Sequence, residues 1–318
     1  MRERSRPLNR KLHVAYDDVY LDWKLGGQEL GLPHPTNPIR AKYATEFLEA
    51  DKDIVIVKPE IDVFDRARLE EIHDPKYVSE VLDLGSSGEW HPDDKHKGQV
   101  ALHMFAGTIR LAEKILNNEI KVGFNPQGAK HHAQYDHSSG FCVFNDMAYA
   151  AKMFQKAGMK VMYIDWDAHH GDGVENLLAD DPDLVTCSIH DATIFPGTGL
   201  DGHTPELGIY NWALDPASGD DVFIRAMGEI EQLADTIKPD VVLLATGADA
   251  HKTDPLSTLQ FDYPGYDYAA RAVGRIASSY ADGRLLIGGA GGYQPCDHTP
   301  LIWSKVVSAA HDEISLFV

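Results

Sequence analysis

The sequence has 318 residues, of which 43% are hydrophobic and 25% charged, and its 49 acidic and 29 basic side chains give a formal charge of −20. This composition is typical of a globular protein that can bury a sizeable core. The negative charge argues against nucleic acid and anionic membranes as partners. It would steer a cationic substrate toward the protein, although an acidic surface can also serve only to keep a protein in solution.

Three widely spaced cysteines, Cys142, Cys187 and Cys296, form neither a disulfide framework nor a Cys-x-x-Cys metal site, which indicates a reducing compartment. No apolar region follows the basic N-terminal stretch, so we expect no secretory signal. The longest apolar runs, such as VVLLA at 241–245, are too short to span a bilayer. We therefore expect a cytoplasmic protein, and the sequence leaves open whether it forms a homo-oligomer.

Short apolar runs alternate with longer amphipathic segments along the chain. The expected elements, in chain order, are a helix at 38–50, a strand at 53–57, a helix at 99–117, a strand at 120–124, a helix at 145–157, strands at 161–166 and 184–189, a helix at 221–236, a strand at 241–246, a helix at 265–280, a strand at 285–288 and a helix at 300–312. Apolar strands separated by helices predict an α/β fold with a central, mainly parallel sheet flanked by helices. We expect one domain over residues 1–318, because no linker or repeat interrupts the pattern.

Unusual residues gather in the loops that follow five of these strands. The loops begin after residues 124, 166, 189, 246 and 288. Ligands of open parallel sheets bind beyond the carboxyl ends of the strands, so we expect these loops to meet at one site.

Two of these loops carry candidate metal ligands. The segment 161–173, VMYIDWDAHHGDG, places Asp165, Asp167 and His169 at alternate positions, where side chains share a direction. Asp249 follows the apolar run 241–245, where a charge is costly unless it is paired or bound to metal. Asp167, His169 and Asp249 would hold a divalent metal and leave positions open for water and substrate. The alternative is that the first segment only caps a strand and the next helix.

Two further loops carry candidate catalytic groups. Neutral imidazole is the usual proton shuttle near pH 7, so His131 and His132 are candidates, with Asp165 and Asp172 orienting one ring each. Tyr293 follows the glycine-rich turn at 288–292 and could donate its hydroxyl to an oxyanion. The turn by itself would equally fit a flexible loop.

Together these segments resemble the arginase/deacetylase superfamily, most closely its zinc-dependent histone deacetylase branch and the prokaryotic, acetoin-utilisation-type relatives. The matching stretches occur in the family's order and are HPTNPIRA (34–41), HH (131–132), SGFCVFND (139–146), DWDAHHGDG (165–173), SIH (188–190), FPGTG (195–199), GADAHKTDP (247–255) and GGAGGY (288–293). They span most of the chain, which makes the resemblance specific.

The resemblance implies an arginase/deacetylase fold that binds one Zn²⁺ per chain through Asp167, His169 and Asp249. It implies that His132 is the general base and then acid, that His131 assists, and that Tyr293 stabilises the oxyanion. The reaction implied is hydrolysis of an acetylated amine, either a protein lysine or a small molecule such as an acetylpolyamine.

Further residues follow from the same resemblance. The residues implied to line a narrow substrate tunnel are Gly140, Phe141, Phe195 and Leu256. Gly291 is implied as a further substrate contact. Arg40 resembles an arginine near the family's internal acetate-exit channel. The family also binds a structural K⁺, here through Asp165, Asp167, His169 and Ser188. The family's rim aspartate has no clear counterpart, and Asp93 and Asp94 are its candidates.

Two other functions fit this sequence less well. An arginase-like ureohydrolase with two manganese ions needs a further carboxylate after Asp167-Ala168-His169, where this chain has His170 and Gly171. A non-catalytic binding or scaffold protein of the same fold would be expected to have lost a ligand, a histidine or Tyr293, and none is missing.

Overall fold

The computed structural model describes residues 11–25, 36–179, 181 and 183–317. His34 and Pro35 of the HPTNPIRA match, and the basic stretch at 1–10, lie outside the described residues. An eight-stranded sheet in the order β2-β1-β3-β8-β7-β4-β5-β6 forms the middle layer, and all of its neighbouring strands are parallel. The predicted fold class is confirmed.

The six expected strands are present and two more join them. The strands are β1 (Leu12–Ala15), β2 (Ile54–Val57), β3 (Val122–Asn125), β4 (Val161–Asp165), β5 (Leu184–Asp191), β6 (Ile209–Leu214), β7 (Val241–Ala245) and β8 (Leu285–Gly288). Strands β1 and β6 were not predicted. β1 (LHVA) is interrupted by His13, and β6 is an edge strand whose half-buried side chains lack a continuous apolar run.

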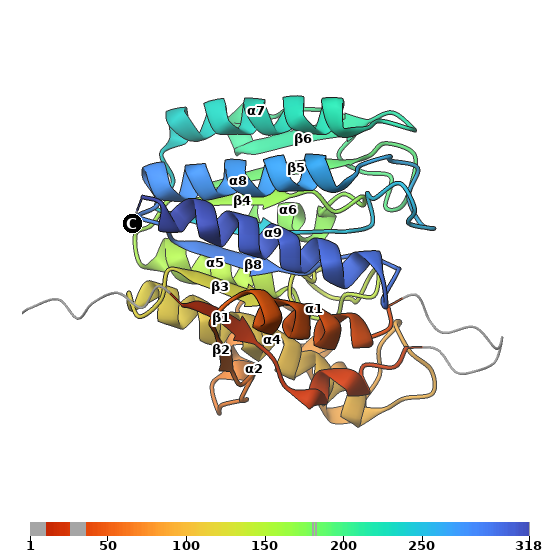
Figure 1. Cartoon of the computed structure of the whole chain (residues 1–318). Coiled ribbons are helices and arrows are strands. Elements are labelled where there is room, and N and C mark those ends of the chain that lie inside the picture. Colours follow the sequence, from red (N-terminus) through yellow and green to blue (C-terminus); the bar gives the residue numbers. More distant parts are fainter. Residues whose placement is uncertain (1–10, 26–35, 180, 182, 318) are drawn as a thin grey trace, which may run out of the picture.

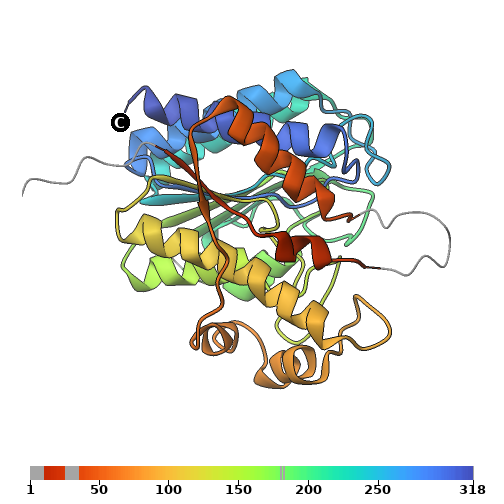
Figure 2. The same cartoon turned by 60° about the horizontal axis from the view of Figure 1, so that its bottom comes forward.

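Helices cover both faces of the sheet (Figures 1 and 2). The α-helices are α1 (Ile39–Asp51), α2 (Asp65–Leu69), α3 (Pro75–Ser79), α4 (Lys95–Leu116), α5 (Asp146–Lys156), α6 (Asp172–Leu178), α7 (Asp220–Ile237), α8 (Tyr263–Tyr280) and α9 (His298–Ser315). Short helical segments of other types are η1 (Asp18–Asp22), η3 (Glu80–Leu84) and η4 (Pro205–Leu207). The six expected helices are present, within a few residues of the expected ends, whereas the short α2, α3 and α6 were not predicted.

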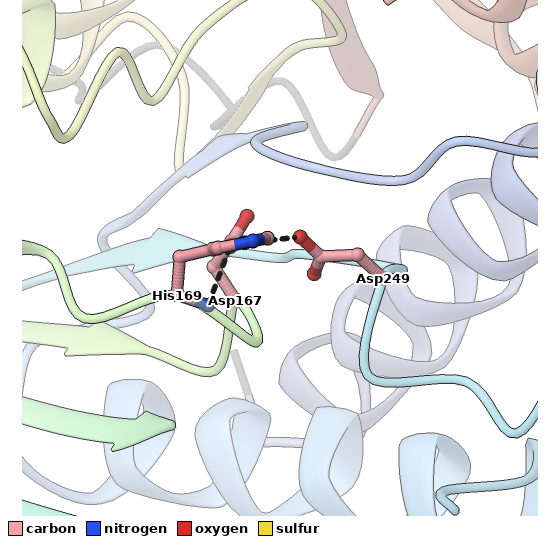
Figure 3. Close-up of side chains that lie close together, drawn as sticks. All are labelled: Asp167, His169 and Asp249. Carbon is pink, nitrogen blue, oxygen red and sulfur yellow. Dashed lines mark hydrogen bonds and ion pairs between the residues drawn. The ribbon is translucent and has the colours of Figure 1, made fainter. Parts of the chain in front are cut away.

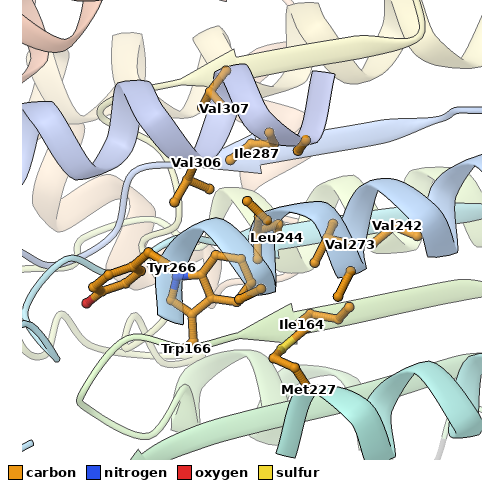
Figure 4. Packing of buried hydrophobic residues seen from close by; sticks show 14 of the residues in the cluster. Ile164, Trp166, Met227, Val242, Leu244, Tyr266, Val273, Ile287, Val306 and Val307 are labelled. Carbon is orange, nitrogen blue, oxygen red and sulfur yellow. The ribbon is translucent and has the colours of Figure 1, made fainter. Parts of the chain in front are cut away.

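The central strands β3, β4, β7 and β8 are buried at every position because helices cover both of their faces. In β4, Met162 and Ile164 face the core beneath α1, α7, α8 and α9, and Val161 and Tyr163 face the core beneath α4, α5 and α6. Figure 4 shows the first of these cores, where side chains of the strands meet those of α7, α8 and α9. Both faces of the sheet are therefore packed against helices, and the loops at its carboxyl edge start from buried strands.

Among the described residues, none of the helices has both the length and the apolar character needed to cross a bilayer.

Candidate metal centre and active site

Three neighbouring strands bring the candidate metal ligands to one edge of the sheet. Asp165 at the end of β4 pairs with Ala245 at the end of β7, and Ala245 pairs with Gly288 at the end of β8. The chains that leave these three strands therefore start side by side, although they are distant in sequence. They carry the 167–169 segment, Asp249 and the glycine-rich turn.

Asp167, His169 and Asp249 converge on one point (Figure 3). The Nδ1 atom of His169 lies 3.0 Å from Oδ1 of Asp167 and 3.0 Å from Oδ2 of Asp249. The other carboxylate oxygens are already occupied, since Oδ2 of Asp167 accepts the Gly291 N–H at 2.6 Å and Oδ1 of Asp249 accepts the Ala168 N–H at 2.9 Å. The atoms that face the shared point are Nδ1 of His169, Oδ2 of Asp249 and Oδ1 of Asp167, which also accepts the His169 N–H at 2.9 Å.

The charges of this group fit a bound cation. All three side chains are buried, and burial together with the charge of Asp167 raises the pKa of Asp249 to about 7. Burial alone would lower the pKa of His169, but the two carboxylates outweigh it and raise that pKa to about 10. Two buried carboxylates close together repel each other when both are ionised, and a bound divalent ion would offset that repulsion. Within the described residues this is the one group with metal-ligand geometry.

The glycine at 291 is required by the approach of the backbone to this group. A Cβ atom at that position would overlap Oδ2 of Asp249 and lie 2.5 Å from Oδ2 of Asp167. Gly291, expected as a substrate contact, thus contacts the candidate metal ligands: its N–H donates to Asp167, and the absence of a side chain allows the close approach. Gly291 also lines a chamber beside these ligands.

The two adjacent histidines each have a carboxylate partner. Nδ1 of His131 lies 2.8 Å from Oδ2 of Asp165, which also accepts the hydroxyl of Tyr163 at 2.6 Å. Nδ1 of His132 lies 2.7 Å from Oδ1 of Asp172. The other oxygen of Asp172 accepts an N–H of Gln134 at 2.8 Å. Both rings are therefore held with Nε2 free of these carboxylates.

The two histidines differ in protonation. Burial works against a charge on His131, but the negative charges of Asp165 and Asp167 outweigh it and raise its pKa to about 9. Burial and the positive charge of His131 lower the pKa of His132 to about 4, although Asp172 opposes this. At neutral pH the pair therefore consists of a charged His131 beside a neutral His132, whose ring centroids are 4.0 Å apart.

An open pocket of about 430 Å³ leads from the surface to this group. It is lined by His132, Gly140, Phe141, His169, Ile194, Phe195, Leu256 and Tyr293. Phe195 is half exposed, with its ring 5.0 Å from that of His132, and Phe141 lies 6.4 Å from the Tyr293 ring. The four predicted tunnel residues thus share one pocket with the catalytic candidates.

Tyr293 stands at the inner end of this pocket, with its ring 6.2 Å from that of His169. Its backbone N–H donates to Oδ2 of Asp254 at 2.8 Å, which fixes the turn that carries it. Burial and the nearby carboxylates Asp249 and Asp167 raise the pKa of its hydroxyl well above the usual range. The hydroxyl therefore stays protonated and can donate a hydrogen bond.

Comparison with known protein families shows the family to which the chain belongs. A model of the histone deacetylase domain matches residues 34–310. The chain belongs to the histone deacetylase family. It is a deacetylase, and the non-catalytic scaffold alternative is not retained.

Relatives of this deacetylase include bacterial and archaeal proteins. The acetoin utilization protein AcuC of Staphylococcus aureus (strain MSSA476) is 30% identical over 95% of this chain and 82% of its own length. AcuC of Bacillus subtilis (strain 168) is 35% identical over 65% of this chain and 56% of its own. A probable deacetylase of Archaeoglobus fulgidus is 34% identical over 61% of this chain and 56% of its own.

The fold has a counterpart among solved structures. The crystal structure of the HDA15 HD domain superposes with a TM-score of 0.82 over 95% of this chain and 88% of that one, at 23% identity. This likeness supports the deacetylase fold.

Several residues of the deacetylase site were absent from the sequence-based expectations. Tyr163, Gln134 and Asp254 hold Asp165, Asp172 and the Tyr293 backbone, respectively. Tyr163 and Asp254 lie within the segments 161–173 and 247–255 but had no assigned role there, and Gln134 acts through a contact with a segment distant in the sequence. Lys130, directly before the two histidines, is also buried beside the site and was not singled out.

The candidates for a rim aspartate lie elsewhere. The side chain of Asp94 caps helix α4 by accepting the His96 N–H at 2.9 Å. Neither Asp93 nor Asp94 is among the described residues that line the outer pocket.

Proposed function

We propose that this chain is a zinc-dependent deacetylase that hydrolyses the N-acetyl amide of a linear amine, such as acetyl-lysine or an acetylpolyamine, to the free amine and acetate. The observation that carries the proposal is the convergence of Asp167, His169 and Asp249 beside two carboxylate-paired histidines at the inner end of one pocket. A metal site, a proton acceptor and a hydroxyl donor then surround the same space.

Asp167, His169 and Asp249 would hold the ion through Oδ1, Nδ1 and Oδ2. When bound, the ion supplies Lewis-acid activation of a water molecule and of the amide carbonyl. His132 is neutral, and its Nδ1 is engaged by Asp172, so Nε2 is left to take the proton of the attacking water.

The remaining groups complete the hydrolysis. The Tyr293 hydroxyl donates a hydrogen bond to the carbonyl oxygen as negative charge develops on it. His132, assisted by His131, whose ring centroid lies 4.0 Å away, returns the proton to the leaving nitrogen as the C–N bond breaks. Asp165 and Asp172 keep the two rings in place.

Turnover of a fluorogenic acetyl-lysine amide by the purified protein tests the function. We expect activity that a chelator abolishes and added Zn²⁺ restores, about one divalent ion per chain by metal analysis, and loss of both ion and activity in Asp249→Ala. Two tightly bound ions, with binding undiminished in Asp249→Ala, would refute the metal assignment.

The pocket also indicates the shape of the substrate. Phe141, Phe195 and Leu256 present apolar surface, on which a slender methylene chain can pack, whereas a group branched beside the amide would meet these walls. We expect higher kcat/KM on acetyl-lysine and acetylpolyamine amides than on N-acetyl α-amino acids. Phe141→Ala should lower kcat/KM on linear substrates and narrow this preference; a wild-type preference for the branched substrates would contradict the tunnel.

Three expectations accompany the proposal. The chain is proposed to fold as one domain over residues 1–318. The K⁺ site at Asp165, Asp167, His169 and Ser188 stays a prediction from the resemblance; Asp165 and Ser188 are partners in the β4–β5 register. A cytoplasmic location also stays a prediction.

A further inference from the structure

The carboxylate of Asp191 lies between two loops that contribute walls to the outer pocket. Asp191 is the last residue of β5 and is buried. Its Oδ1 accepts the Thr193 N–H at 2.9 Å and the Thr193 hydroxyl at 2.7 Å. Its Oδ2 accepts the Thr258 N–H at 2.9 Å and the Thr258 hydroxyl at 2.6 Å. One side chain thus joins two loops that are distant in the sequence.

Each of these threonines is close to residues that line the pocket. Ile194 and Phe195 directly follow Thr193, and Leu256 precedes Thr258 by two residues. Phe195 is 49% exposed and Leu256 is 39% exposed, so neither side chain is fixed by packing in a core. The positions of these two walls therefore depend on the hydrogen bonds of the loops that carry them.

The same loops are connected to the groups that react. The backbone N–H of Asp191 donates to the Ala168 carbonyl at 2.9 Å, within the segment that carries two of the metal ligands. Oδ1 of Asp254 accepts the Leu256 N–H at 3.0 Å, and its Oδ2 accepts the Tyr293 N–H at 2.8 Å. Leu256 thus lies on a loop that is held beside Tyr293 at one end and by Asp191 at the other.

The bonds to Thr258 are more than a local turn. A carboxylate that accepts hydrogen bonds from a residue two positions ahead, as from Thr193, is common where a strand ends. Thr258, in contrast, is 67 residues away, so its two bonds fix the distance between separate loops. Burial alone would raise the pKa of Asp191, but the bonds from Thr258 and Thr193 outweigh it and lower that pKa. The carboxylate is therefore ionised at neutral pH, and bonds to an ionised acceptor are stronger than bonds between neutral groups.

We propose that Asp191 is a positioning residue that sets the width of the outer pocket and, through it, the preference for linear over branched amides. It does so by fixing the separation between the loops that carry Phe195 and Leu256. When the link is cut, the loops move apart: a methylene chain loses apolar contact, and a group branched beside the amide gains room. The effect on substrate choice rests on the proposed function, whereas the link between the loops rests on the hydrogen bonds alone.

Kinetics and amide hydrogen exchange of the zinc-loaded full chain test the proposal. The variants are Asp191→Ala, which removes the link, Thr258→Val, which removes one hydroxyl and keeps the shape, and Thr258→Ser, which keeps the hydroxyl. The matched control is Asp240→Ala. Oδ2 of Asp240 accepts the Lys160 N–H at 2.9 Å and so joins the segments before β4 and β7, at the opposite edge of the sheet.

The kinetic measure is the ratio of kcat/KM on an acetyl-lysine amide to kcat/KM on an N-acetyl α-amino acid. We expect this ratio to fall at least ~10-fold in Asp191→Ala, mainly through a higher KM on the linear substrate, because the groups that react stay in place. Thr258→Val should lower the ratio about threefold, and Thr258→Ser should recover it. Thr258→Val added to Asp191→Ala should change nothing further, since both act on one link. Asp240→Ala should keep the wild-type ratio.

Hydrogen exchange gives a readout that does not depend on turnover. The protection of the Thr193 and Thr258 N–H groups should fall at least ~10-fold in Asp191→Ala and persist in Asp240→Ala. Metal analysis should give the same bound ion in all variants, because Asp191 is not among the proposed ligands.

Unchanged protection of both N–H groups in Asp191→Ala would overturn the link. Lost protection with an unchanged substrate ratio would overturn the role in substrate choice and leave the deacetylase function standing. If Asp191→Ala does not fold, as judged by near-UV circular dichroism, Thr258→Val and Thr193→Val decide the question, because they keep the carboxylate. Protection that depends on Asp191 in a protein that hydrolyses no acetylated amine would refute the proposed function and leave the link between the loops standing.

Discussion

At the residue scale, the hydroxyl of Tyr293 is the group whose contribution can be isolated most cleanly. Tyr293→Phe keeps the ring that packs near His169 and Phe141 and removes only the donor. We expect kcat to fall by about 100–1,000-fold, as for other oxyanion donors, with a much smaller change in KM because the hydrogen bond strengthens in the transition state. Steady-state kinetics on an acetyl-lysine amide measure both.

Tyr266→Phe is the control for this variant. Tyr266 is buried nearby in the core, and its hydroxyl has no hydrogen-bond partner among the described residues, so its removal should leave kcat almost unchanged. A loss of less than about threefold in Tyr293→Phe would remove this tyrosine from the mechanism.

Asp172 acts on the reaction through His132. Its carboxylate raises the pKa of His132 against the opposing effects of burial and His131. Asp172→Asn should therefore lower that pKa further, shift the acidic limb of kcat/KM to lower pH and reduce kcat by roughly 10–100-fold. A pH profile of kcat/KM for both proteins gives the comparison, and an acidic limb that does not move would contradict the pairing.

At the scale of elements, the turn after β8 must approach the loops after β4 and β7 without a side chain. Gly291→Ala would place a methyl group against Oδ2 of Asp249, a proposed ligand atom, and against Oδ2 of Asp167. We expect a folded protein that loses its bound metal and its activity together. Gly228→Ala in α7 is the control, because a Cβ there meets nothing within 4 Å and alanine favours a helix. Metal analysis measures the bound ion, and circular dichroism shows whether the variant is folded. Full metal content in Gly291→Ala would contradict the close approach of the 291 backbone to the ligands.

At the scale of the whole molecule, His73 joins three segments that are distant in sequence. Its Nδ1 bonds to the Gln134 carbonyl at 2.7 Å, and its Nε2 accepts the Asn145 N–H at 3.0 Å. Burial lowers its pKa to about 4 from 6.5, so the unfolded chain takes up a proton at a higher pH than the folded one. The stability that neutral His73 provides is complete above pH 6.5 and is lost as the pH falls toward 4, to a total of about 3 kcal/mol.

Urea unfolding at pH 7, 5.5 and 4.5 measures this loss. His73→Gln cannot titrate, so its free energy of unfolding should be lower than that of wild type at pH 7 and should fall less steeply with acidification. Buried His190 has a similarly low pKa and remains in both proteins, so the difference between the two slopes isolates His73. Equal slopes would show that His73 is not neutral in the folded state.

Local sequence determined the framework of this molecule. Runs such as VMYI (161–164) and VVLLA (241–245) are apolar at every position because strands covered on both faces need it, and such runs marked six of the eight strands. It also placed Asp167, His169 and Asp249 just beyond strand ends, where the carboxyl edge of a parallel sheet collects its ligands. Strands β1 and β6 were not predicted, because His13 interrupts the apolar residues of β1 and the side chains of β6 are mostly half-buried.

The tertiary structure alone decided which groups meet. The order of β8, β7 and β4 within the sheet brings Gly291, Asp249 and Asp167 together, and no local pattern encodes that order. The same holds for Thr193 and Thr258, which are distant in the sequence and bind one carboxylate. Side-chain pairing across such distances depends on how helices and strands pack. The sequence therefore indicated the chemistry of the metal centre, whereas the partners that hold it and the carboxylate that joins two walls of the pocket became visible only in the folded chain.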